Sequence, residues 1–227
     1  MRISRLKARW ARFWISFSGT GLIGRIASYL AALATPPYYG RVSLSKLSTK
    51  GYVSAKAVIH HHLLELGKFC YIADGVLIYQ DRKGGAVQLG DAIHLHDNTV
   101  IQTGRGGSVS IGADTHIQPR CQISAYEGPI KFGERVEIAP NCAFYSYDHG
   151  ILPNTSIREQ PVTTKGGIII EDDAWLGYGV IVLDGVRIGK GAVIGAGSVV
   201  TKNIPDGGIA IGVPAKVIKL RSESETQ

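Results

Sequence analysis

The sequence predicts an all-β protein: a parallel β-helix of hexapeptide repeats, preceded by an α-helical extension. Three features of the 227-residue chain support this prediction. Aliphatic or aromatic residues recur at every sixth position, Gly, Asn and Asp are frequent between them, and the first 50 residues follow a different, basic and helical pattern. A hydrophobic content of 44% suits a globular chain with a full core.

The six-residue period is clearest in residues 170–205. This run reads IEDDAW LGYGVI VLDGVR IGKGAV IGAGSV VTKNIP, with an aliphatic residue first in each of six hexads. A period of six fits neither an amphipathic helix nor a heptad coiled coil. In a parallel β-helix, three hexads close one triangular coil, and stacked coils pair their strands about 4.8 Å apart. Gly, Asn and Asp suit the corners, where φ is often positive. A β-sandwich is the alternative, but 36 residues in unbroken register favour the β-helix.

The starting positions of successive coils reveal where the repeat is interrupted. Coils start at residues 47, 66, 89, 111, 132, 170 and 188, so relative to 18 residues per coil the insertions are 1, 5, 4, 3, 20 and 0 residues long. The long insertion occupies about 146–167, SYDHGILPNTSIREQPVTTKGG, and holds a single histidine, His149. Long excursions from a compact scaffold are usually functional or disordered. We therefore expect a functional loop here.

Residues 1–46 are predicted to form a basic, amphipathic helical extension. Residues 1–50 contain nine Lys/Arg and no Asp/Glu, which accounts for the net charge of +7, since the remainder carries −2. Apolar residues recur there at helical spacing beside a stripe of arginines: Ile3, Leu6, Trp10, Phe13, Trp14 and Phe17, with Arg2, Arg5, Arg9 and Arg12. Such helices bind anionic membrane surfaces. The alternatives for residues 1–34 are membrane-surface contact and capping of the open first coil, and the two are compatible.

Other targeting and partner classes are less well supported. Arg25 interrupts the apolar stretch and Pro36-Pro37 ends it, so neither a membrane-spanning helix nor a cleaved signal peptide is expected. Three cysteines without CxxC spacing, Cys70, Cys121 and Cys142, indicate reduced core thiols and a reducing compartment. The mildly acidic remainder of the chain contains no module for reading nucleic acid. Residues 221–227 read as a polar tail.

The order of motifs in residues 47–220 resembles the hexapeptide-repeat acyltransferases, specifically the maltose, galactoside and polysaccharide O-acetyltransferase group. The motifs are PNCAFYSYDHG before the loop, then AWLG, GAGSVVTK and GVPAKVI. The resemblance implies a left-handed β-helix, a homotrimer with sites between subunits, and acetyl-CoA as co-substrate without a metal. It implies O-acetylation of a carbohydrate. The membrane-prone extension is the reason to expect that this acceptor belongs to polysaccharide or lipid-linked saccharide biosynthesis. Because acetyl-CoA is a cytoplasmic metabolite, we expect a cytoplasmic protein, peripheral at the inner face of the membrane if the extension binds lipid.

Three alternatives remain open at this point. The first is N-acetylation of an amino sugar or a small-molecule amine, and the second is a non-catalytic β-helix scaffold. The third is a zinc site, because His94 and His116 occupy the same step of consecutive coils, where they should stack, and His96 is close in sequence. Zinc catalysis needs three such ligands and an open water position. The histidine-pair pattern of trimeric β-helix carbonic anhydrases is missing, so no metal is expected.

Acetyl transfer from a thioester to a hydroxyl needs a general base and a donor for the developing oxyanion. Histidine suits the first task near neutral pH. His149 lies at the start of the long insertion, where the resembling family has its catalytic histidine, so we predict that His149 is the base. Asp148 either orients the imidazole or caps a turn. The alternative for His149 is a solvated turn residue.

The resemblance also implies binding residues. The acetyl-CoA contacts would be Trp175 at the thioester end, Tyr178 and Ala196 along the pantetheine arm, Thr201 and Lys202 toward the adenosine, and Lys216 and Lys219 as further phosphate contacts. Trp175 could instead pack at a corner, and each lysine could serve solubility alone. IQPRCQ stands where related enzymes carry an asparagine-containing segment. Acceptor contacts are therefore predicted only at Gln118, Tyr126 and Arg158, with a loop salt bridge as the alternative for the last.

Overall fold

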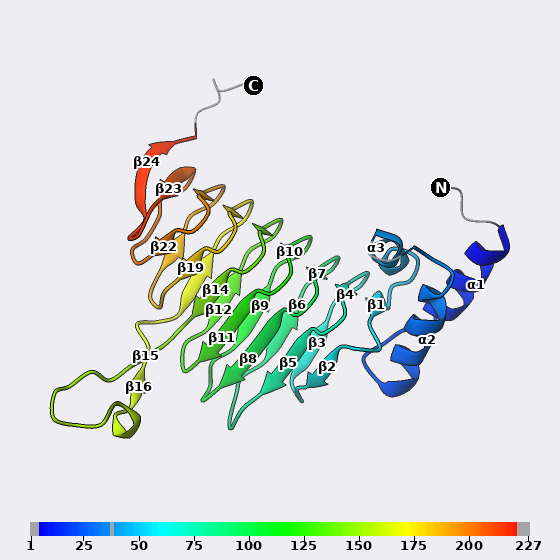
Figure 1. Cartoon of the computed structure of the whole chain (residues 1–227), viewed down its shortest axis with the longest axis horizontal. Coiled ribbons are helices and arrows are strands. Elements are labelled where there is room, and N and C mark those ends of the chain that lie inside the picture. Colours follow the sequence, from blue (N-terminus) through cyan, green and yellow to red (C-terminus); the bar gives the residue numbers. More distant parts are fainter. Residues whose placement is uncertain (1–4, 37–38, 222–227) are drawn as a thin grey trace.

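The computed structural model describes residues 5–36 and 39–221. Three helices come first, α1 (Arg5–Ile15), α2 (Leu22–Ala32) and α3 (Tyr39–Ser45), and a long stack of parallel strands follows (Figure 1). The predicted extension residues 1–4, Pro37 and the tail from residue 222 onward lie outside the described residues. The division of the chain after residues 46 and 220 stays a prediction.

The strands form three parallel sheets, which are the three faces of a triangular prism. Sheet A contains, in spatial order, β1 (Tyr52–Val53), β4 (Tyr71–Ile72), β7 (His94–Leu95), β10 (His116–Ile117), β13 (Glu137–Ile138), β18 (Trp175–Leu176), β21 (Val193–Ile194), β23 (Gly208–Ile211) and the antiparallel β24 (Lys216–Leu220). Sheet B contains β2 (Val58–His60), β5 (Leu77–Gln80), β8 (Val100–Gly104), β11 (Gln122–Tyr126), β14 (Ala143–Tyr145), β19 (Ile181–Val182) and β22 (Val199–Val200). Sheet C contains β3 (Leu64–Leu66), β6 (Val87–Leu89), β9 (Val109–Ile111), β12 (Ile130–Phe132), β17 (Ile168–Ile170) and β20 (Arg187–Ile188). The chain visits the sheets in the order A, B, C, which confirms the predicted β-helix.

The first residue of each hexad lies inside the prism. In sheet B these residues form a ladder of fully buried side chains: Ile78, Ile101, Ile123, Phe144, Val182 and Val200. Burial of each such side chain contributes about 1.5–3 kcal/mol. The turn between sheets A and B has positive φ at Asn98, Arg120 and Asn141, in line with the expected corner geometry, although an arginine was not expected there.

All the insertions counted in the sequence lie at one edge of the prism. Each falls between a strand of sheet B and the following strand of sheet C, an edge that we call corner BC; corner AB is the edge between sheets A and B. Because the coils are stacked in register, the turns after β5, β8 and β11 form a continuous ridge at corner BC. The long insertion extends this ridge and projects from the stack as the β15–β16 loop (Figure 1).

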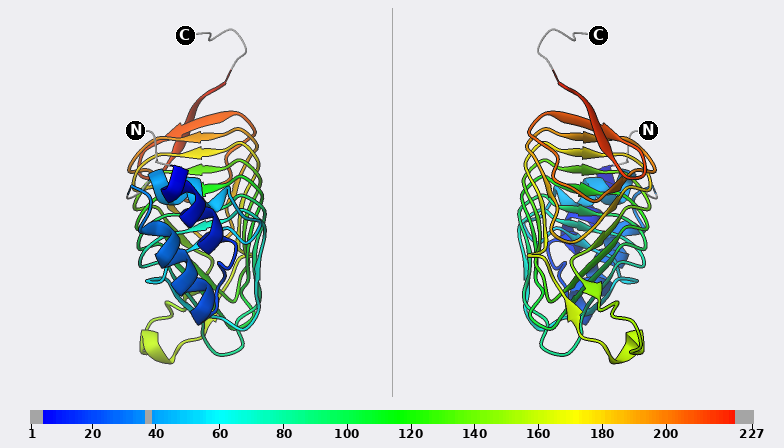
Figure 2. Two further views of the ribbon diagram at one scale, coloured as in Figure 1. Left: turned by 90° about the vertical axis from the view of Figure 1, so that its right-hand side faces the viewer. Right: turned by 90° about the vertical axis from the view of Figure 1, so that its left-hand side faces the viewer.

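The three helices cover the first coil. Ala11, Ile15, Ala31 and Leu44 are buried and belong to the same core cluster as the β-helix residues. The Arg25 guanidinium donates a hydrogen bond to the carbonyl of Ala57 at 2.7 Å, which fastens α2 to the turn before β2. In the end-on view, α1 and α2 lie across the end of the prism (Figure 2). No helix in the described part of the chain has the length and apolar content needed to cross a bilayer.

The predicted histidine stack is present. The His94 and His116 rings are parallel, with centroids 4.1 Å apart. Within residues 5–36 and 39–221, however, no cluster of three His, Cys, Asp or Glu side chains is arranged to hold a metal ion. The three cysteines are free and buried, as predicted.

Candidate active site

The long insertion is a hairpin fixed to corner BC at both ends. Strand β15 (Asp148–His149) pairs antiparallel with β16 (Val162–Thr163), which places His149 opposite Val162. A short 3-10 helix, η1 (Ile157–Glu159), lies between the strands. The Gln160 side chain, 8% exposed, fixes the tip: its Oε1 accepts from the Leu152 amide at 2.7 Å, and its Nε2 donates to the carbonyls of Leu152 and Thr155 at 3.1 and 2.9 Å.

The loop exit is held by Asp184 from the next coil. This carboxylate is 5% exposed and accepts hydrogen bonds from the Thr164 hydroxyl at 3.0 Å, the Gly167 amide at 2.9 Å and the Lys165 amide. At Gly167, φ is +91°, and a β-carbon would lie 2.1 Å from the Pro129 carbonyl oxygen. Only glycine fits this turn without a shift of the backbone. The loop therefore has a defined conformation.

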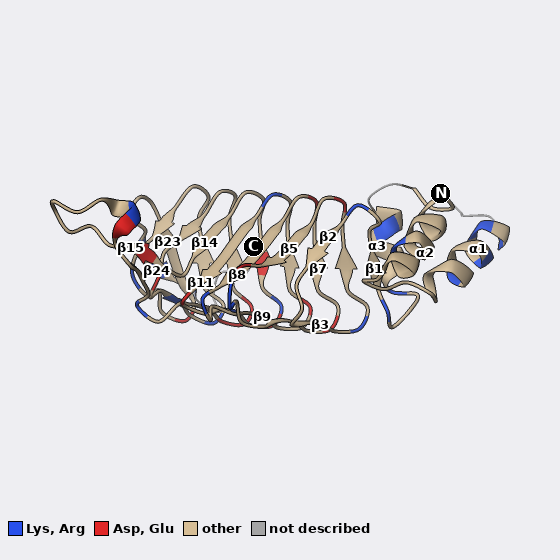
Figure 3. Cartoon of the chain, turned by 90° about the horizontal axis from the view of Figure 1, so that it is seen from below, with Lys and Arg blue, Asp and Glu red and all other residues tan. Residues whose placement is uncertain are grey.

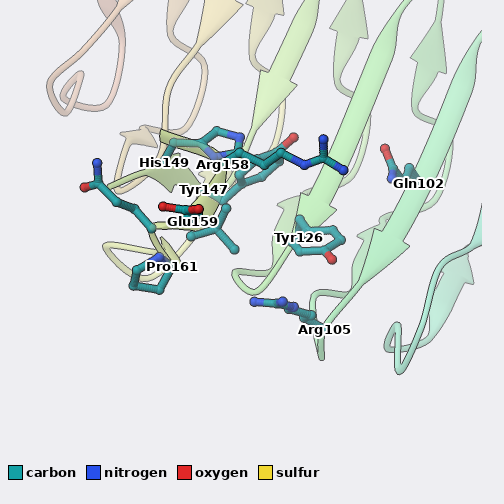
Figure 4. Close-up of a pocket in the computed structure, with 10 residues that line it drawn as sticks. Gln102, Arg105, Tyr126, Tyr147, His149, Arg158, Glu159 and Pro161 are labelled. Atoms are coloured by element: carbon teal, nitrogen blue, oxygen red, sulfur yellow. The ribbon is translucent and has the colours of Figure 1, made fainter. Parts of the chain in front are cut away.

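These contacts place His149 on the wall of an open cleft of about 500 Å³ at corner BC (Figure 4). The imidazole is exposed and lies edge-on to Tyr147, with ring centroids 6.1 Å apart. Tyr147 in turn contacts Tyr126, with centroids 5.4 Å apart. The other lining residues come from β8, from the turn after it and from the loop: Gln102, Arg105, Arg158, Glu159, Gln160, Pro161 and Val162. The structure thus brings together His149, Tyr126 and Arg158 of the predicted site.

Asp148 has a different neighbour from the one expected of an imidazole-orienting residue. The Lys165 ammonium lies 2.5 Å from its Oδ2 and donates a hydrogen bond to it, which raises the pKa of Lys165. Adjacent residues of a strand point to opposite sides, so Asp148 and His149 face apart. In this geometry Asp148 ties the entry of the loop to its exit.

The cleft offers both aromatic faces and cationic donors. The Arg105 guanidinium carbon lies 5.9 Å from the centroid of the Tyr126 ring, and its NH1 is 3.4 Å from Glu127. Arg158 is exposed and has no carboxylate partner among the described residues. In Figure 4 its side chain extends from the loop toward Gln102, across the mouth of the cleft. Such a cleft suits a hydroxyl-rich ligand, because aromatic rings pack on apolar surfaces while arginines donate several hydrogen bonds.

The other predicted residues lie elsewhere on the prism. Gln118 follows β10 at corner AB and does not line the cleft. Trp175 is 54% exposed on the outer surface of sheet A, and Tyr178 and Ala196 lie on consecutive coils of corner AB, where the Gly197 amide donates to the Tyr178 carbonyl at 2.8 Å. The remaining predicted residues are exposed, two of them at corner BC beyond the loop and two on β24: Thr201 and Lys202, then Lys216 and Lys219.

Sheet A and corner BC are on opposite sides of a triangular prism, so Trp175 and His149 of one chain do not meet. The sequence interpretation also missed Tyr147, Arg105 and Gln102, which line the cleft. The alternation Tyr145, Tyr147, His149 was a usable signal, because residues two apart on an extended segment face the same side. No local sequence pattern identifies Arg105 or Gln102 as cleft residues, because only the stacking of coils places them beside the loop.

Comparisons with known proteins agree with this architecture. Residues 167–202 match the family model described as bacterial transferase hexapeptide (six repeats). The galactoside O-acetyltransferase of Lactococcus lactis is 43% identical over 96 residues, which cover 42% of this chain and 45% of that protein. A protein of Mycobacterium tuberculosis named "probable acetyltransferase" is 32% identical over 164 residues, 72% of this chain and 53% of that one. The chain thus spans about half the length of the curated relatives it matches.

A solved structure extends the comparison to most of the fold. The crystal structure of the polySia specific acetyltransferase NeuO has a TM-score of 0.62 and 23% sequence identity, and the match covers 78% of this chain and 81% of that chain. At this identity the likeness concerns the fold, and together with the repeat match it confirms the left-handed β-helix. Residues 167–202 therefore carry the hexapeptide repeat of bacterial transferases, within a β-helix that extends over most of the chain.

Proposed function

We propose that this protein is an acetyl-CoA-dependent O-acetyltransferase that acetylates a hydroxyl of a carbohydrate, in polysaccharide or lipid-linked saccharide biosynthesis. The observation that carries the proposal is the exposed imidazole of His149, held by a fixed loop on the wall of a cleft lined by tyrosines and arginines. The relatives named as acetyltransferases, one of them a galactoside O-acetyltransferase, support the same chemistry.

In this proposal His149 is the general base. Its unprotonated ring nitrogen takes the proton of the acceptor hydroxyl as the oxygen attacks the thioester carbonyl, and the C–S bond then breaks as the ester C–O bond forms. The proton passes from the imidazolium to the CoA thiolate, so CoA leaves as the free thiol. Because the Asp148 carboxylate faces Lys165, we assign Asp148 a positioning role in the loop in place of contact with the imidazole.

The acceptor would lie in the cleft beside His149. Tyr126 and Tyr147 present ring faces for a sugar, and Arg158 presents a guanidinium without a carboxylate partner in the described chain. Gln118 belongs to a different edge of the prism, so it is not part of this acceptor site within the same chain.

The predicted acetyl-CoA contacts favour a site shared between subunits. Trp175, Tyr178 and Ala196 lie on sheet A and corner AB, on the far side of the prism from His149. A thioester bound near Trp175 of one subunit reaches His149 only if that residue comes from a neighbouring subunit. We therefore propose a homotrimer, the closed arrangement in which corner BC of each subunit faces sheet A of the next.

The test follows thiol release from acetyl-CoA in the presence of purified protein and pools of saccharides. O-acetylation predicts acceptor-dependent thiol release and a product that loses its acetyl group in mild alkali. A product stable to alkali would be an amide and would assign the protein to N-acetylation of an amino sugar or another amine. Absence of CoA binding at millimolar concentration would leave only the scaffold alternative.

A further inference from the structure

The cap formed by α1 and α2 leaves an apolar outer surface. Ala11 and Ile15 are buried inside the cap, whereas a second set of large apolar side chains on α1, α2 and the adjoining turns is exposed. Ile23 and Leu6 are 80% and 79% exposed. Tyr29 and Leu33 of this kind border a small pocket against the first coil, and the others, which we call the cap face, are Leu6, Trp10, Phe13, Phe17, Leu22, Ile23 and Ile26. Capping therefore accounts for one side of the helix pair and leaves the other uncovered.

The charge around the cap face has one sign. The first 50 residues contain no Asp or Glu (Figure 3). Arg5, Arg9 and Arg12 are exposed on α1, and none of the described carboxylates pairs with them. Arg25 and Arg41, by contrast, bond to the Ala57 carbonyl and to Asp74, so they serve the cap itself. The arginines that remain beside the cap face are available to an anionic partner.

The structure assigns the cap face to an anionic lipid bilayer, and we propose that it binds the membrane surface with α1 and α2 lying in the headgroup region. A second copy of the chain is disfavoured as occupant, because two copies meeting at this face would bring arginines against arginines. Trp10 fits the lipid assignment: its ring is exposed, but its indole N–H already donates to the Leu30 carbonyl at 2.7 Å. The ring can therefore enter apolar surroundings without burying an unpaired donor. Basic helices with aromatic residues on the apolar side are typical of interfacial binding.

This placement has a consequence for the acceptor, which rests on the proposed function. The helices lie across the end of the prism, so the prism axis would stand roughly upright on the bilayer (Figures 1 and 2). The loop belongs to the fifth coil, four coil steps of about 4.8 Å from the first, and a helix layer adds about 10 Å. The cleft would then lie on the order of 30 Å above the lipid. A membrane-bound acceptor must therefore carry a saccharide of several units, and a single lipid-linked sugar would not reach.

Flotation of the full chain with vesicles, without acetyl-CoA, tests the membrane contact separately from catalysis. The probes are vesicles of phosphatidylcholine alone and vesicles of equal parts phosphatidylcholine and phosphatidylglycerol. We expect the chain to float only with the anionic vesicles. The triple variant Arg5→Gln/Arg9→Gln/Arg12→Gln should lower the partition coefficient about a hundred-fold, at roughly fivefold per arginine. The matched control Lys68→Gln/Lys83→Gln/Lys131→Gln loses the same charge from the β-helix surface and should float as the wild type does.

A second variant tests the apolar part of the cap face. Leu6→Ser/Phe13→Ser should also abolish flotation, with Ile169→Ser as the control for an exposed apolar residue on sheet C, and circular dichroism should show that all variants are folded. A wild-type chain that stays unbound, or an arginine variant that floats equally well, would overturn the proposal. The chain could also associate with itself in the absence of vesicles, in a concentration-dependent way. If Leu6→Ser/Phe13→Ser abolished that association, the cap face would bind a second copy of the chain and the proposal would be overturned. A His149→Ala variant should float as the wild type does. The membrane contact is therefore tested independently of the catalytic proposal.

Discussion

Replacing Asp184 with alanine should release the β15–β16 loop while leaving the β-helix folded. The carboxylate accepts hydrogen bonds from the Thr164 hydroxyl and from the amides of Lys165 and Gly167, all at the loop exit. A hydrogen bond to a charged group contributes about 1.5–3 kcal/mol, and bonds that share one acceptor are not additive. Removing a buried charge also recovers part of its desolvation cost. We therefore expect the loop to open more easily by about 3 kcal/mol, which raises the open population about a hundred-fold.

Native-state hydrogen exchange measures this local opening. The Gly150 amide, which donates to the Pro161 carbonyl at 3.1 Å across the hairpin, should exchange about a hundred-fold faster in Asp184→Ala than in the wild type. Amides between inner strands should keep their rates. Asp172→Ala is a matched control, because Asp172 also accepts a bond from a backbone amide, that of Glu134 at 2.9 Å, but at a corner remote from the loop. It should leave Gly150 unchanged.

If the Gly150 amide exchanged at the same rate in Asp184→Ala and in the wild type, the carboxylate would not be holding the loop. Turnover provides a second readout. Because the loop carries His149, kcat should fall with the population of the closed loop, whereas the Kd for CoA should stay the same.

Three further predictions concern the core, the histidine stack and the cleft. Ile123 is fully buried, so Ile123→Ala should lower the free energy of unfolding, measured in urea, by about 3 kcal/mol. Ile169→Ala, on the exposed side of sheet C, should change it by less than about 1 kcal/mol. Equal effects would contradict the placement of Ile123 inside the prism. Burial, with the nearby His116 imidazole, lowers the pKa of His94 to about 4. An unfolded imidazole has a pKa of about 6.5, so as the pH falls the unfolded state binds the proton before the folded state does. The free energy of unfolding should therefore fall by on the order of 2 kcal/mol between pH 6.5 and pH 4. In His94→Gln, that part of the pH profile of stability should be flatter. Arg158→Gln should raise the acceptor KM about tenfold without changing the Kd for CoA, and an unchanged KM would remove Arg158 from the acceptor site.

The architecture was predictable because the β-helix is periodic. The hexad position of Ile123 specifies its inward orientation, and the gap between coil starts gives the length of each insertion. The stacking of His94 on His116 follows from the same register. These properties depend on spacing along the chain alone.

The candidate site was less predictable, because its contacts join residues from different coils. The Asp148–Lys165 pair closes the loop across 17 positions, and the Asp184 carboxylate reaches it from the next coil. Arg105 reaches the cleft only because all insertions fall at the same corner. The six-residue period does not specify these contacts between coils. The pattern of the helical extension was visible, but which side of α1 is buried depends on its packing against α2 and α3.

The most direct test of the account compares the turnover of His149→Ala with that of the wild type under saturating acetyl-CoA and a saccharide acceptor. A lost general base predicts a fall in kcat of about a hundred- to ten-thousand-fold, with the Kd for CoA unchanged. His62→Ala, which removes another exposed imidazole from the first coil, should keep wild-type turnover. Wild-type turnover in His149→Ala would contradict the assignment of the loop imidazole as the group that takes the acceptor proton.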